Sequence, residues 1–213
     1  MSITIRRETP NDYIKVEEVT REAFWNMHRP GCDEHYLVNS MRSHPDFISE
    51  LDYVLEADGE VIGSIMYTMA KLHSEEGHTL DILTFGPLSI LPKYQRKGFG
   101  KHLMEYSMAR AKELAYPAIV IYGNPNNYLG AGFKSAHRFG ISSMDGTFPA
   151  AMLAVVFDQG KLRNGKWKYV ESSVYEVDKI KAEMFDRSFE PKQKEYAISQ
   201  EVFYILSKSR ITG

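Results

Sequence analysis

The sequence predicts an α/β fold in which helices cover a mixed sheet, and three observations lead to this prediction. Two apolar runs flank Asp58-Gly59, a residue pair that strongly favours a β-hairpin. Residues 80–90, 99–115 and 118–122 have the patterns of a strand, a helix and a strand, the order of a right-handed βαβ unit with parallel strands. Apolar stripes between residues 9 and 42 predict two helices before the hairpin.

The N-terminal elements follow from local signals. Alternating apolar residues predict a short strand over residues 3–6. A helix is expected to start at Thr9, because Thr9 can cap it, Pro10 suits its first turn and Asp12 can reach back to the cap. The second helix is expected over residues 33–42.

The central strand and helix carry two further expectations. Gly86-Pro87 interrupts the strand over residues 80–90, and proline cannot donate to a ladder, so we expect a bulge or a splayed strand there. The helix after it has two apolar rows. One row holds Leu103, Ser107, Arg110 and Leu114, and the other holds Met104, Met108, Ala111 and Ala115; the second row is the better candidate for the core face.

The C-terminal part predicts short elements. They are a helix or turn over residues 128–133, two strands within 134–157 (one at Met152–Phe157), a strand or hairpin over 167–177, and a strand over 202–206. No linker or repeat divides the chain, so we expect one domain over residues 1–160 and an extension over 161–213 packed on it.

Composition limits the partners. Across 213 residues the formal net charge is −2, which disfavours nucleic acid or a membrane surface as the primary partner. Cys32 is the single cysteine and cannot form an internal disulfide, and no apolar run approaches the length of a signal peptide core or a membrane span. These features favour a cytoplasmic protein. The few ligand-type residues near Cys32 complete no metal site.

A glycine-rich turn, Gln95-Arg96-Lys97-Gly98-Phe99-Gly100, lies between the predicted strand and helix. Its glycines allow a tight turn and a close ligand approach, and the helix N-terminus offers free N–H groups to an anion such as pyrophosphate. Arg96, Lys97 and Lys101 add positive charge. The alternative is a plain surface turn. The spacing matches neither a P-loop nor the dinucleotide fingerprint.

The stretch Gly86–Gly100 resembles the central motif of the GNAT superfamily of N-acetyltransferases, which ends in Gln/Arg-x-x-Gly-x-Gly/Ala. Downstream, Tyr128-Leu129-Gly130-Ala131-Gly132-Phe133 is similar to the family's Tyr-x-x-x-Gly-Phe segment. The two motifs stand in the expected order with the expected strand between them, and the resemblance covers residues 2–157. It implies the GNAT fold, a mostly antiparallel sheet with a splayed parallel strand pair at its centre.

The resemblance also implies acetyl-CoA as the co-substrate, held between the splayed strands 83–90 and 118–122. Ile121 replaces an asparagine that the family often carries before the tyrosine, which weakens the expected side-chain contacts from that loop. The expected cofactor-binding residues are Leu88, Ser89 and Ile90 along the pantetheine arm, Gln95, Arg96, Lys97, Gly98, Phe99, Gly100 and Lys101 at the pyrophosphate, and Asn124, Asn127 and Tyr128 in the loop.

The implied reaction is direct attack of a primary amine on the thioester through a tetrahedral intermediate. The backbone N–H of Leu88 is the expected oxyanion donor, and Tyr128 is the expected acid for the leaving thiolate, although a tyrosine there could simply pack. Asp81 is the first candidate base; His78, Glu56, His35 and Glu34 are alternatives, and water could serve instead. A non-catalytic acyl-CoA-binding module is the alternative function.

The acceptor is a small-molecule or protein amine, and the sequence does not distinguish the two. The resemblance places segment 25–35 over the acceptor pocket, where Asp33 and Glu34 either attract a cation or start a helix. In the tail, Trp167, Tyr169 and Tyr175 either cover the acceptor side or form an interface of a homodimer, unless they simply pack.

Overall fold

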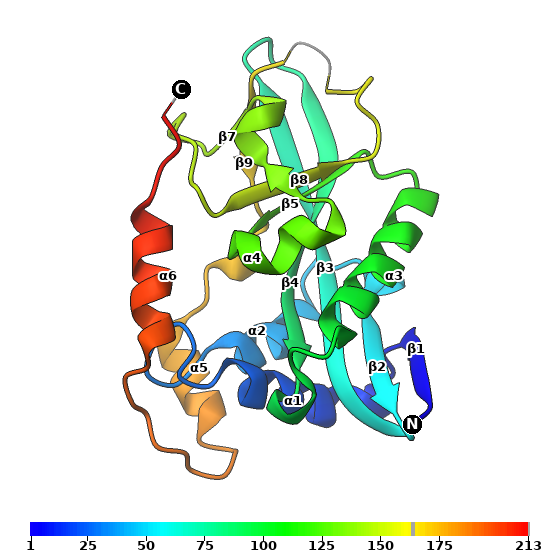
Figure 1. Ribbon diagram of the computed structural model, residues 1–213, viewed down its shortest axis with the longest axis vertical. Coiled ribbons are helices and arrows are strands. Elements are labelled where there is room, and N and C mark those ends of the chain that lie inside the picture. Colours follow the sequence, from blue (N-terminus) through cyan, green and yellow to red (C-terminus); the bar gives the residue numbers. More distant parts are fainter. Residues whose placement is uncertain (163–164, 213) are drawn as a thin grey trace.

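The computed structural model describes residues 1–162 and 165–212 and is built around one mixed sheet (Figure 1). The strands run in the order β1-β2-β3-β4-β5-β8-β6, and β9 joins β3 to β7. Their bounds are β1 Ile3–Arg7, β2 Tyr53–Ala57, β3 Glu60–Ser74, β4 Thr79–Ile90, β5 Ala118–Tyr122, β6 Lys134–Ser135, β7 Ile141–Ser142, β8 Met152–Val156 and β9 Trp167–Val170. The helices are α1 Tyr13–Phe24, α2 Glu34–Met41, α3 Phe99–Glu113, α4 Pro125–Tyr128, α5 Lys179–Asp186 and α6 Ile198–Lys208.

The N-terminal elements form as the local signals predict. The backbone N–H of Thr9 donates to the Asp12 carboxylate at 2.8 Å, which fixes a single 3-10 turn ahead of α1. Helix α1 buries Val16 and Val19, and α2 buries Val38, against the β2–β3 hairpin. These contacts place α1 and α2 on one face of the sheet.

The parallel strand pair is confirmed, and it is short. Strands β4 and β5 share one paired position, Leu83 with Ile119, before they diverge. On the other side of β4, the register with β3 shifts between Ile65 and Tyr67, opposite Gly86-Pro87. The predicted bulge is therefore real, and beyond Leu83 no strand among residues 1–162 and 165–212 pairs with the β5-facing side of β4.

Helix α3 covers the opposite face of the sheet from α1 and α2 (Figure 1). Met104, Met108 and Ala111 of the expected core row are buried, and Leu103 and Ser107 of the other row are buried with them. Ser107 is tolerated there because its hydroxyl lies 2.8 Å from the hydroxyl of buried Tyr67. Ala115 lies beyond the helix, with φ of +61°.

The predicted strand over residues 202–206 was wrong, since these residues lie in α6. The apolar residues Ile198, Val202 and Ile205 recur at helical spacing, which favours the helix. Helix α6 stands at one side of the molecule (Figure 1). Its start is held where the Gln200 side-chain amide donates to the Asn26 carbonyl at 3.1 Å. Among the described residues, no helix is both long and apolar enough to cross a membrane.

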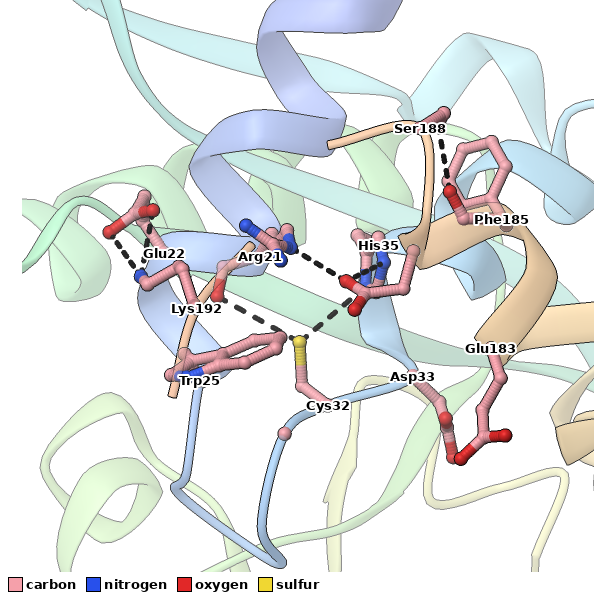
Figure 2. Close-up of polar contacts among 12 residues, drawn as sticks. Arg21, Glu22, Trp25, Cys32, Asp33, His35, Glu183, Phe185, Ser188 and Lys192 are labelled. Carbon is pink, nitrogen blue, oxygen red and sulfur yellow. Dashed lines mark hydrogen bonds and ion pairs between the residues drawn. The ribbon is translucent and has the colours of Figure 1, made fainter. Parts of the chain in front are cut away.

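A buried polar cluster attaches α5 to α1 and α2 (Figure 2). The Arg21 guanidinium donates to the Asp186 carboxylate at 2.7 Å, and the same carboxylate lies 3.1 Å from Nε2 of His35. On the other side of the ring, Nδ1 of His35 lies 3.4 Å from Sγ of Cys32. Burial is the main cause that lowers the pKa of His35 to about 4, although the Asp186 charge opposes it. His35 is therefore neutral at pH 7.

Acid is expected to loosen this attachment through His35. The ordinary pKa of 6.5 falls to about 4 in the folded state, so the unfolded chain binds more protons between these values. The contribution of neutral His35 to the free energy of unfolding is complete above pH 6.5 and is lost as the pH falls towards 4. The loss amounts to about 2 kcal/mol at pH 5. Urea unfolding at pH 7.5 and at pH 5 measures this change. The variant His35→Gln should reduce the change of unfolding free energy between the two pH values, whereas His78→Gln, at an exposed turn, should leave it as in wild type. The same change in wild type and in both variants would contradict the assignment to His35.

Candidate active site

Backbone N–H and C=O groups of β4 line the opening between β4 and β5. One hydrogen bond between β4 and β3 shows which of these groups face the opening. The N–H of Leu91 donates to the carbonyl of Ile62 on β3 at 2.8 Å. Because backbone groups alternate along an antiparallel pair, Ser89 also points its N–H and C=O at β3, whereas Leu88 and Ile90 point theirs away from it. The backbone groups of Leu88 and Ile90 are therefore directed as the pantetheine expectation requires, whereas the backbone of Ser89 faces β3 and its hydroxyl donates to Thr20 at 2.9 Å. The pantetheine contacts themselves stay a prediction.

The glycine-rich turn lies at the end of the opening where β4 finishes, and it leads into α3. The Gln95 side-chain amide donates to the Ile90 carbonyl at 2.8 Å, which ties the turn to the end of β4. Arg96 and Gly98 have φ of +61° and +89°, so the chain reverses tightly there. Gly98 is the N-cap of α3 and has no side chain to satisfy the first N–H groups of the helix.

The turn has the shape and charge of an anion site. Apart from the adjacent chain, no atom of the described residues lies within 4 Å of the place where a Cβ of Gly98 would stand, so a ligand can approach the backbone. Arg96 is exposed, and within the described residues its guanidinium makes no ion pair. Lys97 donates to the Lys93 carbonyl at 2.7 Å, and Lys101 pairs with Glu105 at 3.6 Å. Free N–H groups at a helix start beside cations are suited to a phosphate group.

Tyr128 lies at the other end of the opening. Its ring packs 6.0 Å from Phe85 of β4 and 5.8 Å from Phe133, between ring centroids. It also covers Gly123, where a Cβ would meet the ring at 2.3 Å, so only glycine fits beneath it. Burial raises the pKa of Tyr128 to about 12, which keeps the phenol protonated at neutral pH.

Two expected loop contacts have other roles in the structure. The Asn124 side chain accepts a hydrogen bond from the N–H of Asn126 at 3.1 Å and so caps α4. Asn127 is exposed one turn later. Their side-chain contacts with a ligand stay a prediction, and the capping bond gives Asn124 a structural reason to be present.

Comparison with known proteins identifies this arrangement. The acetyltransferase (GNAT) family model matches residues 18–131, more than half of the chain and both ends of the opening. The chain belongs to this family.

Solved GNAT structures share the fold. A GNAT family N-acetyltransferase (YhbS) from Escherichia coli, in complex with CoA, matches with a TM-score of 0.70 and 22% identity, covering 82% of this chain and 92% of that chain. A GNAT family acetyltransferase from Brucella melitensis, in complex with acetyl-CoA, gives 0.62 and 22%, covering 82% and 98%. The ribosomal-protein-S18-alanine N-acetyltransferase from Escherichia coli gives 0.52 and 17%, covering 74% and 95%. No curated protein matches the chain significantly in sequence.

The candidate bases of this GNAT chain do not gather at the opening. Asp81 is exposed near the start of β4 and pairs with Lys71 at 3.1 Å, two residues before the parallel pair at Leu83. Its role as base stays a prediction, and its geometry favours a surface ion pair. The other candidates also have partners: Glu56 with Arg6, His78 with Glu76, Glu34 with His28, and His35 with Asp186.

The C-terminal segment contacts strand β4, which borders the opening. The Tyr175 hydroxyl donates to the Gly86 carbonyl of β4 at 3.1 Å. Tyr169, in β9, contacts Tyr122 at the end of β5 with ring centroids 5.9 Å apart. Tyr169 and Tyr175 were singled out in the sequence, but the contact of Tyr169 with Tyr122 was missed.

Proposed function

We propose that this GNAT chain transfers an acetyl group from acetyl-CoA to a primary amine by direct attack. The observation that carries the proposal is the opening between β4 and β5. Backbone groups of Leu88 and Ile90 are directed away from β3 there, and the opening lies between a glycine-capped helix start and the partly buried phenol of Tyr128. Each part suits one portion of acetyl-CoA: the helix start suits the pyrophosphate, the bare strand edge suits the amide-bearing pantetheine arm, and the phenol suits the sulfur.

The residues divide the chemistry between them. The amine attacks the carbonyl carbon of the thioester, and negative charge develops on the carbonyl oxygen. The N–H of Leu88 is directed away from β3 and is the donor we assign to this oxyanion. As the carbon–sulfur bond breaks, Tyr128 supplies a proton to the thiolate, and its pKa of about 12 keeps that proton available at neutral pH.

Two measurements test the proposal. Calorimetry with acetyl-CoA is expected to give saturable binding at a single site. With acetyl-CoA bound, a panel of primary amines is expected to release free thiol, which a thiol reagent detects. Binding without release for any amine would favour a non-catalytic acyl-CoA-binding module, and absence of binding would remove the basis of the proposal.

A further inference from the structure

Helix α6 carries a row of exposed apolar side chains, which we call the outer row. It consists of Ile198, Val202 and Ile205, which are 80%, 48% and 57% exposed. Their spacing of four and three residues places them on one face of the helix. The opposite face contacts the rest of the molecule, since Gln200 is buried there and the Phe203 ring stacks on a histidine after α1, with ring centroids 4.5 Å apart.

The direction of the outer row leaves α6 without the packing that normally holds a helix. Isolated helices of 11 residues are marginal in water, and most helices in proteins are stabilised by burial of their apolar face. Figure 1 shows α6 at the edge of the molecule, and no other described element lies beyond it in this view. An exposed apolar face bordered by polar residues is typical of a protein interface. We therefore expect a partner to cover the outer row.

Two opposite charges border the outer row and indicate what the partner is. Glu201 lies in the first turn of α6 and Lys208 is its last residue, seven positions later, so both project from the same side of the helix. Both are exposed, and neither makes an ion pair within the described part of the chain. If two copies of α6 pack antiparallel, the first turn of each helix lies beside the last turn of the other. Glu201 of each copy then lies beside the partner's Lys208, and Val202 lies beside the partner's Ile205.

The size of this face indicates a dimer that forms reversibly. With roughly 150–250 Å² for a large side chain, the exposed parts of the outer row, of Tyr204 and of the two charged residues provide about 500 Å² per copy. Two copies would bury about 1,000 Å², the lower limit for a specific interface. We therefore expect a Kd in the micromolar range.

The observations favour a second copy over other partners. Helices that lie on membranes usually have a basic polar face, whereas α6 has one acidic and one basic side chain along its length. Trp167 and Tyr169, which the sequence offered as an alternative interface, are buried within the chain itself. A single helix whose two ends carry opposite charges is complementary to itself, as the two-fold interface of a homodimer requires.

We propose that α6 forms a homodimer interface in which two copies pack their outer rows antiparallel and Glu201 of each copy pairs with the partner's Lys208. Sedimentation velocity on the full chain, over a series of micromolar concentrations, measures this association. Wild type is expected to pass from monomer to dimer along the series. Ile205→Asp places a charge in the centre of the interface, twice in each dimer, and should weaken association at least ~100-fold. The matched control Ile14→Asp changes an exposed isoleucine on α1 and should associate as wild type does.

Charge reversal tests the antiparallel pairing itself. Glu201→Lys and Lys208→Glu each place like charges side by side, twice in each dimer, and each should weaken self-association about tenfold. Mixed in equal amounts, the two variants should associate as wild type does, because every pair in the mixed dimer again joins opposite charges. A substitution that only weakened the helix would not be repaired by mixing, so this result does not depend on how well Ile205→Asp folds.

Three outcomes would overturn the inference. They are a wild-type protein that stays monomeric at every concentration, an Ile205→Asp variant that associates as wild type does, and charge variants that do not recover when mixed. A monomeric wild type that sediments with vesicles of phosphatidylcholine and phosphatidylglycerol, while Ile205→Asp does not, would assign the outer row to a lipid surface instead. A monomeric wild type that ignores these vesicles would assign it to a different protein.

Discussion

Glutamate in place of Gly98 is expected to abolish acetyl-CoA binding, with a loss of at least ~100-fold in affinity. Gly98 caps α3, and its backbone leaves open space where a side chain would project. A carboxylate there would fill the ligand's place and repel a pyrophosphate, and each 1.4 kcal/mol of lost interaction weakens binding about tenfold. Calorimetry with acetyl-CoA on the purified variant measures the effect.

The control for this variant is Gly77→Glu. Gly77 has φ of +86°, close to the +89° of Gly98, and its Cβ would also meet no other atom within 4 Å. Both variants therefore carry the same backbone strain, about 1–2 kcal/mol, and the same added charge. Gly77 lies in the turn between β3 and β4, away from α3. Equal affinities for the two variants would show that the glycine turn does not hold the pyrophosphate.

The sequence predicted those parts of the molecule whose structure depends on near neighbours in the chain. The helix start at Thr9 and the hairpin at Asp58-Gly59 depend on hydrogen bonds and turn chemistry within a few residues, and both form as expected. The glycine turn before α3 belongs to the same class. Its left-handed residue Gly98 lies at the helix start that the motif indicated.

The remaining features depend on contacts between distant segments. Helix α6 was expected as a strand because a short apolar run fits the period of a strand as well as that of a helix. The hydrogen bond that holds it joins Gln200 to Asn26, 174 residues away in sequence. Tyr175 had no local pattern that indicates its partner, because its hydrogen bond to the Gly86 carbonyl joins residues 89 positions apart. Asp81, by contrast, was named from its place on the strand, and only the structure shows its exposed pairing with Lys71.

Phenylalanine in place of Tyr128 is expected to lower kcat about 100-fold while leaving the affinity for acetyl-CoA nearly unchanged. The change removes only the hydroxyl. The ring would keep its packing over Gly123 and against Phe85 and Phe133, so the fold and the opening should persist. Steady-state kinetics with an accepted amine and calorimetry with acetyl-CoA measure the two quantities separately.

The same variant decides between an acid and a packing residue. A tyrosine that only packs would lose nothing essential on conversion to phenylalanine, so wild-type kcat in Tyr128→Phe would exclude the acid role. Tyr106→Phe on α3 is the matched control, because Tyr106 is 39% exposed and contacts Tyr53 rather than the opening. Since the pKa of Tyr128 is about 12, its proton is not lost at neutral or mildly basic pH. The wild-type kcat should therefore show no alkaline decrease from this group, and a decrease near pH 8 that vanished in Tyr128→Phe would contradict a phenol that stays protonated.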